Sequence, residues 1–246
     1  MKPLTQIIMM SSRRLLDNQE ILANNISNAS TTGFKAKLLS RNVILENRND
    51  KESNYLPEMT YDQTQGLFRN TSRPLDFSIK DKDGWLAVQV NNNEIAYTKN
   101  GHLQINKNQQ ICSQNNVVIG ENGPITVPDY SDIKILSDGT ISISNNDKNF
   151  DQKIDKIRLV RIDSKNLKYS NNGLYFLKDK NQINSELKNN DNINILPETL
   201  EDSNVNLPES IVDMISDSRM FDIYMKILMH RDESLQLINK FLNVNN

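Results

Sequence analysis

The chain is poor in the residues from which most metal and redox sites are built. Among 246 residues there is one cysteine, Cys112, and there are two histidines, His102 and His230. A single cysteine excludes a disulfide within the chain, and the cysteine and histidine spacings typical of a zinc site do not occur. We therefore expect no metal site and no cofactor.

The chain also lacks a basic block and a long apolar run. Its 29 basic and 31 acidic residues give a net charge of −2, which argues against a nucleic-acid partner. No segment has the length and apolar content of a membrane span, so we expect no direct membrane insertion. Residues 4–10 are too short and too polar for a cleaved signal peptide. We expect a cytoplasmic protein or one exported without such a signal.

Glycine is scarce, and no phosphate-binding glycine loop is present; Gly120 and Gly123 form a turn pair instead. His102 follows a predicted turn at the surface, and His230 lies on the outer side of a predicted helix. Cys112 has the pattern of a strand residue. Catalytic triads assemble in space, so spacing alone does not exclude one. These positions nevertheless favour a protein that is not an enzyme.

A seven-residue apolar repeat runs through the last forty residues. Its column consists of Met214, Phe221, Leu228, Leu235 and Leu242. Such a repeat is typical of a helix that lies along another helix in a left-handed supercoil. Pro208 and Glu209 suit a first turn, and Lys240 suits a last one. The pattern predicts a helix over 208–243, about 54 Å long at about 1.5 Å per residue.

A second, narrower column lies at the other end of the chain. It consists of Ile8, Leu15, Leu22 and Ala29. A narrow apolar seam suits a coiled-coil partner better than a globular core. Two heptad helices at opposite ends of one chain predict an antiparallel pair with the middle as an insertion. The alternative is two unrelated amphipathic helices on one core.

The middle of the chain has the pattern of β structure. Five of the eight glycines follow Asn or Asp between positions 84 and 173, which is typical of tight turns. A three-residue loop ending at Gly139 pairs Ile135 with Ile141, and the same argument around Gly101 pairs Tyr97 with Leu103. Trp85 is expected in the core of this region.

The predicted fold class is therefore α+β, with a mainly antiparallel β domain between two long helices. The predicted domains are a helix and loop over 1–36, an extended connector over 37–74 with short strands near Leu67-Phe68, a β domain over 75–195, and a coiled-coil helix over 196–246.

The first helix ends in a run rich in Asn, Ser and Thr, residues that compete for backbone hydrogen bonds and stop helices. Gly33 can take the positive φ that closes such an end. The run resembles the N-terminal signature of the bacterial flagellar axial proteins, which are rod, hook and hook-associated subunits. The matching residues are Asn24, Asn25, Asn28, Thr32, Gly33, Phe34 and Lys35.

Within that family the chain is most similar to proximal rod subunits, through the stretches 73–76, 83–89, 123–128 and 200–206. The alternative is a distal rod or other axial subunit. A distal subunit would carry Gly-Phe-Phe near position 85, where this chain has Gly84-Trp85-Leu86.

The resemblance implies a structural subunit of the proximal rod in the periplasm, exported through the flagellar type III apparatus. Its expected partners are other rod subunits and copies of itself, polymerised through the terminal helices to transmit torque and form part of the export channel. The expected assembly interface is Ile8, Leu15, Leu22, Ala29, Met214, Phe221, Leu228, Leu235 and Leu242. The signature loop is expected to fix how the helix pair meets the next subunit or the β domain. An alternative from another class is a stand-alone β binding module whose terminal helices form a dimer.

Overall fold

The computed structural model describes residues 2–39, 59–90, 94–128, 132–145, 148–163, 166–170, 173–178 and 193–244. Spatial grouping divides the chain into two units. The helical unit contains residues 1–29, 36–62 and 205–246, and the β unit contains residues 30–35 and 63–204.

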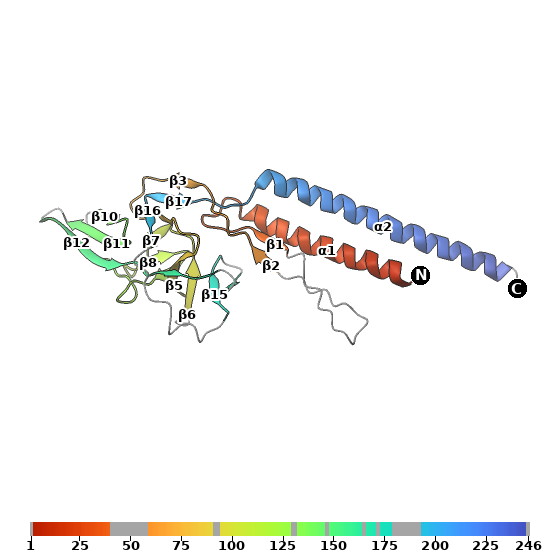
Figure 1. The fold of residues 1–246 in the computed structure, drawn as a ribbon, viewed down its shortest axis with the longest axis horizontal. Coiled ribbons are helices and arrows are strands. Elements are labelled where there is room, and N and C mark those ends of the chain that lie inside the picture. Colours follow the sequence, from red (N-terminus) through yellow and green to blue (C-terminus); the bar gives the residue numbers. More distant parts are fainter. Residues whose placement is uncertain are drawn as a thin grey trace. The chain divides into compact units, whose positions relative to one another are not determined.

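The helical unit is built on helices α1 (Lys2–Ser27) and α2 (Leu207–Val244), and Figure 1 shows them side by side. The Asn206 side chain caps α2: its Oδ1 accepts from the Glu209 N–H at 3.4 Å, and its Nδ2 donates to Glu209 Oε2 at 2.9 Å. Neither helix has, within the described residues, the length and apolar content needed to cross a bilayer.

Two contacts fix the antiparallel register of the helices. Asn18 Nδ2 donates to Asp217 Oδ2 at 2.6 Å, and the Arg231 guanidinium bonds to the Thr5 hydroxyl. At this register Ile8, Leu15 and Leu22 are level with about Leu228, Phe221 and Met214 of the other predicted apolar column. The structure confirms the predicted contact between the terminal helices.

A short two-stranded sheet in the helical unit was not predicted. Strand β1 (Lys37–Leu39) pairs antiparallel with β2 (Met59–Tyr61). Each strand has only three residues, which is too short for a two-residue periodicity to stand out. Residues 40–58 of the predicted connector lie outside the described residues.

Two small antiparallel pairs lie at the entry of the β unit. Strand β3 (Phe68–Asn70) pairs with β17 (Thr199–Glu201), and β4 (Phe77–Ile79) pairs with β16 (Ile195–Pro197). The first of these confirms the strand predicted near Leu67-Phe68.

An eight-stranded antiparallel sheet forms the centre of the β unit. Its strands are β5 (Gly84–Val90), β6 (Glu94–Thr98), β7 (Leu103–Ile105), β8 (Ile111–Ser113), β9 (Asn116–Val118), β13 (Leu159–Arg161), β14 (Leu167–Tyr169) and β15 (Tyr175–Leu177). The order is β14-β15-β6-β5-β9-β8-β7, and β13 also pairs with β5. A three-stranded sheet contains β10 (Asp132–Ile135), β11 (Thr140–Asn145) and β12 (Lys148–Lys156).

One hydrophobic cluster is shared by these sheets. Its fully buried members include Phe77, Leu86, Val88, Leu103 and Ile141. Trp85 is buried as predicted; its Nε1–H donates to the Ile162 carbonyl at 3.1 Å, and its ring lies 4.7 Å from that of Tyr175. An indole with its N–H satisfied is a stable core element.

The two predicted hairpins have different outcomes. Around Gly139, Ile135 pairs with Ile141 as predicted, and Gly139 has φ +85°. The prediction that Tyr97 pairs with Leu103 is wrong, because Tyr97 pairs with Ala87 and Leu103 with Ser113. The chain after Gly101 runs instead along the segment before β4, where Leu103 N–H donates to the Leu75 carbonyl. A turn signal fixes a local reversal, whereas tertiary contacts decide which strands pair.

We predict that Ile141→Ala lowers the free energy of unfolding by about 2–5 kcal/mol, because it leaves a cavity at a fully buried position. Leu136→Ala, at a neighbouring position that is 40% exposed, should cost below about 1 kcal/mol. Urea unfolding followed by circular dichroism measures both. Equal losses in the two variants would contradict the assignment of Ile141 to the core.

Candidate functional site: the signature loop and the entry to the β unit

The first signature residues act within the helical unit. Asn25 is buried, and its amide makes two hydrogen bonds to the backbone of Lys37: Nδ2 donates to the carbonyl at 2.9 Å, and Oδ1 accepts from the N–H at 2.8 Å. The side chain thereby imitates a neighbouring strand and attaches the start of β1 to the end of α1. Asparagine suits this role because its amide carries both a donor and an acceptor.

Asn28 closes the end of α1. Its Nδ2 donates to the Asn24 carbonyl at 2.9 Å, and its backbone N–H approaches the carbonyls of Asn24 and Asn25. The last carbonyls of a helix have no partner within the helix, so these contacts satisfy groups that would otherwise need water. The density of asparagine in the signature thus has a local structural cause.

Gly33 makes the closest backbone approach of the signature loop within the β unit. It has φ +69°, and its N–H donates to the Glu201 carbonyl at 2.7 Å, on the outer edge of β17. A Cβ at this position would lie 2.7–2.9 Å from backbone atoms of Lys99 and Asn100. Both the backbone conformation and the available space therefore require glycine.

Lys35 and Glu201 form a buried ion pair. Lys35 Nζ lies 2.6 Å from Glu201 Oε1, and the two side chains are 6% and 1% exposed. Lys35 also donates to the Thr64 carbonyl at 2.8 Å, and Glu201 accepts from the Gly66 N–H at 2.9 Å. Buried charges are tolerated where the partner and further hydrogen bonds replace water, and both charges meet that condition here.

Asn204, in the segment that precedes α2, also contacts the segments that carry Lys35 and Thr64. The Asn204 side-chain amide donates to the Thr64 carbonyl at 3.0 Å, and its backbone N–H donates to the Phe34 carbonyl. We call this set the entry cluster: Gly33, Lys35, Thr64, Gly66, Glu201 and Asn204. It fastens together the three chain segments 33–35, 64–66 and 201–204, through which the chain enters and leaves the β unit.

Lys99 lies directly under the signature loop. It is 4% exposed, and its Nζ donates to the carbonyls of Asp81 at 3.0 Å and Lys82 at 2.7 Å. The ammonium also lies 5.0 Å from the centroid of the Trp85 ring. Burial, reinforced by the charge of Lys35, lowers the pKa of Lys99 to about 8, although Glu201 and nearby aspartates act in the opposite direction.

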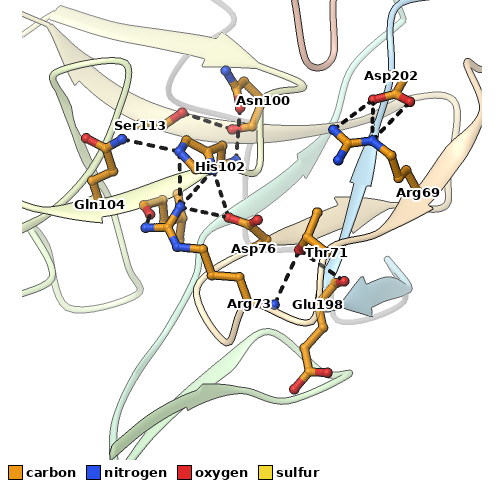
Figure 2. A network of polar contacts seen from close by, with 11 residues as sticks. Arg69, Thr71, Arg73, Asp76, Asn100, His102, Gln104, Ser113, Glu198 and Asp202 are labelled. Carbon is orange, nitrogen blue, oxygen red and sulfur yellow. Dashed lines mark hydrogen bonds and ion pairs between the residues drawn. The ribbon is translucent and has the colours of Figure 1, made fainter.

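A second polar network surrounds Asp76 (Figure 2). Arg73 Nη1 lies 3.3 Å from Asp76 Oδ1, and its Nη2 donates to the Leu103 carbonyl at 2.8 Å. His102 Nδ1 lies 2.9 Å from the same carboxylate. The His102 side chain, which was predicted at the surface, is 38% exposed, and its ring is held by Asp76 and Arg73.

The described residues contain no group of three or more histidine, cysteine or acidic side chains that could hold a metal ion. His230 is exposed on α2, where its Nδ1 lies 3.3 Å from Glu233 Oε2. Cys112 is buried, and burial raises the pKa of its thiol. Glu201, Lys99 and Thr64 were not predicted as site residues; a charged residue at the end of a short strand carries no local signal of burial.

Most of the predicted interface residues lie where α1 and α2 run side by side, but Ala29 follows the end of α1, and Leu235 and Leu242 lie on α2 beyond the start of α1. Ile8 and Leu22 are buried, and Leu15 and Ala29 are partly buried. On α2, Met214, Phe221, Leu228 and Leu235 are partly buried, and the side chain of Leu242 lies outside the described residues. Contacts of these residues with a neighbouring subunit stay a prediction.

Comparison with known proteins identifies the same segments. The family model described as "Flagella basal body rod protein" matches residues 14–35, which include the signature loop. The model "Flagellar hook protein FlgE/F/G D1 domain" matches residues 81–143, and "Flagellar basal body rod FlgEFG protein C-terminal" matches residues 196–241. Together these matches define the class as a flagellar axial subunit.

Full-length relatives narrow this class. The flagellar basal-body rod protein FlgF of Buchnera aphidicola subsp. Baizongia pistaciae is 40% identical, with 100% of both chains covered. FlgF of Salmonella typhimurium is 35% identical over 95% of this chain and 96% of its own. The rod protein FlgG of Buchnera aphidicola subsp. Acyrthosiphon pisum is 25% identical, over 91% and 93%.

The chain belongs to the flagellar basal-body rod protein family, a family of structural subunits, and it is of the FlgF type. Membership assigns it to the rod of the basal body and implies assembly with other rod subunits.

We predict that Lys35→Met and Glu201→Gln each lower the free energy of unfolding by about 3–5 kcal/mol, because each leaves a buried charge without its partner. The double variant should lose less than the sum of the two. Trp85 is the only tryptophan, so its fluorescence during urea unfolding measures the β unit. The exposed pair Arg69–Asp202 is the matched control, and Arg69→Met should cost about 1 kcal/mol or less. Additive losses at Lys35 and Glu201 would contradict the coupling.

We predict that Gly33→Ala destabilises the β unit more than Gly173→Ala does. The two glycines have similar φ, +69° and +75°, so each substitution carries the backbone cost of about 1–2 kcal/mol. Only Gly33 has backbone atoms within 3 Å of the added methyl group, which should add about 1–3 kcal/mol. Equal midpoints in urea would show that Gly33 is required for φ alone.

Proposed function

We propose that this chain is a proximal rod subunit that polymerises through its terminal helices, transmits torque and forms part of the export channel. The observation that carries this proposal is the distribution of apolar residues on α2. Large apolar side chains are exposed on sides of α2 away from the predicted column, including Val212 (64%), Ile223 (49%) and Ile227 (44%). Apolar residues on more than one side of a helix suit burial against more than one neighbour, and within the described residues α1 supplies one such neighbour.

Partial burial of the seam supports the same proposal. Phe221 and Leu228 remain partly exposed although they lie on the side of α2 that meets α1. In a coiled coil such residues are normally enclosed by the facing helices. The remaining exposure is what a further helix from a neighbouring subunit would remove.

The unequal length of the two helices supports it as well. At the register fixed by Asn18–Asp217 and Thr5–Arg231, Lys2 lies level with about Ser234. The part of α2 beyond Ser234 therefore extends roughly 15 Å past α1, at about 1.5 Å per residue. Leu235 and Leu237 lie on this extension. A contact between an extension on one copy and a different surface on the next is heterologous, as a helical assembly requires.

In this proposal the entry cluster is the mechanical joint of the subunit. The chain passes between the helical unit and the β unit at the segments 30–35, 63–66 and 201–204, so these segments carry a torque on the terminal helices along the chain into the β unit. The buried pair Lys35–Glu201 and the close approach of Gly33 hold these segments together. We further propose that the subunit lies in the periplasmic part of the rod and is exported through the flagellar type III apparatus.

We predict that Ile223→Asp abolishes incorporation into the rod while leaving the β unit as stable as before. A buried carboxylate without a partner opposes packing between helices, whereas Ile223 is already 49% exposed in the single chain. The measurement is the amount of the chain in purified basal bodies, together with swimming, in cells that carry the variant as their only copy.

Leu136→Asp is the matched control, because it places the same charge at an aliphatic residue of similar exposure, 40%, in the β unit. It should incorporate and support swimming. Normal rods built from Ile223→Asp would contradict the proposal. A discrete dimer in sedimentation, with no rod defect on deletion of the chain, would favour the stand-alone dimeric module.

A further inference from the structure

The turn that carries Lys99 is the surface on which the signature loop rests. The Lys99 carbonyl carbon and oxygen and the Asn100 nitrogen are the atoms that leave no room for a side chain at Gly33. A change in the position or the free energy of this turn therefore changes how well Gly33 packs against it. Lys99 itself is 4% exposed, so its charge is part of that energy.

The Lys99 ammonium is buried without a counter-ion of its own. Its hydrogen-bond partners are two carbonyl oxygens, and no carboxylate of the described residues lies within ion-pair distance of Nζ. Glu201, on β17, is already paired with Lys35. The charged groups that act on Lys99 from the surrounding elements are Lys35 on the signature loop, Glu201 on β17, and Asp81 and Asp83 in the turn between β4 and β5. Two buried lysines thus share one buried carboxylate.

Loss of the Lys99 proton removes the free-energy cost of burying a charge but keeps the two hydrogen bonds of Nζ. A neutral amine still carries two hydrogens, enough for the carbonyls of Asp81 and Lys82. It no longer repels Lys35, and its burial no longer opposes a charge. Lifting the loop would take the charge of Lys35 away from Lys99 and admit water at the turn, and both changes would raise the pKa of Lys99 from about 8 towards its ordinary value.

The direction of the pH dependence follows. Between about pH 8 and 10.5 the open loop binds a proton at Lys99 that the seated loop does not. Because the state that binds fewer protons gains stability as pH rises, seating of the loop strengthens with rising pH in this window.

We propose that Lys99 is a proton-controlled latch for the signature loop. With the ammonium form, Gly33, Phe34 and Lys35 are held weakly on the β unit; with the neutral amine they are held tightly. The inference deepens the role proposed above for the entry cluster and rests on it. A protonated latch makes residues 33–35 easier to detach from the rest of the β unit before assembly, and a deprotonated latch holds them in place.

The test is hydrogen exchange of the full-length chain, read from peptides spanning residues 30–36 at pH 7, 8 and 9. The Gly33 N–H is the probe, since its hydrogen bond to Glu201 exists only in the seated loop. Each rate is divided by the intrinsic rate at that pH. The protection factor of the wild-type chain should rise up to about tenfold from pH 7 to 9, since one proton is released near pH 8. In Lys99→Gln it should not change with pH.

Lys80→Gln is the matched control, because it removes the same charge from an exposed lysine near the same turn; the pH dependence should persist there. Peptides from the three-stranded sheet in the same sample separate loop opening from global unfolding, and they keep the test valid if Lys99→Gln folds poorly. A wild-type protection factor that is flat from pH 7 to 9, or a rise that survives Lys99→Gln, would overturn the latch. Loss of rod incorporation in other variants bears on the proposed function and not on this result.

Discussion

The buried pair of Lys35 and Glu201 is the interaction on which the arrangement of this chain depends. It joins a loop that follows α1 to the strand that precedes α2, residues that are 166 positions apart in sequence. Around it, Gly66 and Thr64 supply the hydrogen bonds that make the burial of two charges tolerable. The segment that follows α1 and the segment that precedes α2 are therefore joined within the β unit, independently of any contact along the helices.

The two units differ in what stabilises them. The β unit has a shared hydrophobic cluster with many fully buried side chains, such as Leu86, Val88 and Ile141. The helical unit has a seam whose α2 side remains partly exposed and outer apolar residues such as Ile223 that nothing in the described chain covers. Hydrophobic burial is the main favourable term in folding, so the β unit completes its own core, whereas the helical unit leaves apolar surface uncovered in the single chain.

The two polar networks of the β unit also differ in physical character. The Arg73 and His102 side chains that contact Asp76 are each 38% exposed. Water therefore shares in their solvation, and the contacts position the side chains but contribute little to stability. Lys35, Glu201 and Lys99 are almost fully buried, where each charge interacts strongly with the others. The second network is therefore both the stronger joint and the one that responds to the loss of a single proton.

Sequence alone determined the elements whose signal is repeated along the chain. The columns through Leu15 and Phe221 predicted both terminal helices and their pairing, because a heptad repeat reports the same face at every second turn. The signature from Asn24 to Lys35 identified the family, and the turn at Gly139 gave a correct register because a hairpin is a local structure. The same argument failed at Gly101, and it did not point to Glu201 or Lys99. Those outcomes depended on which distant segments came together: β7 beside β8, and β17 beside the signature loop. Pairing and burial are properties of contacts between residues far apart in sequence, and only the tertiary structure could decide them.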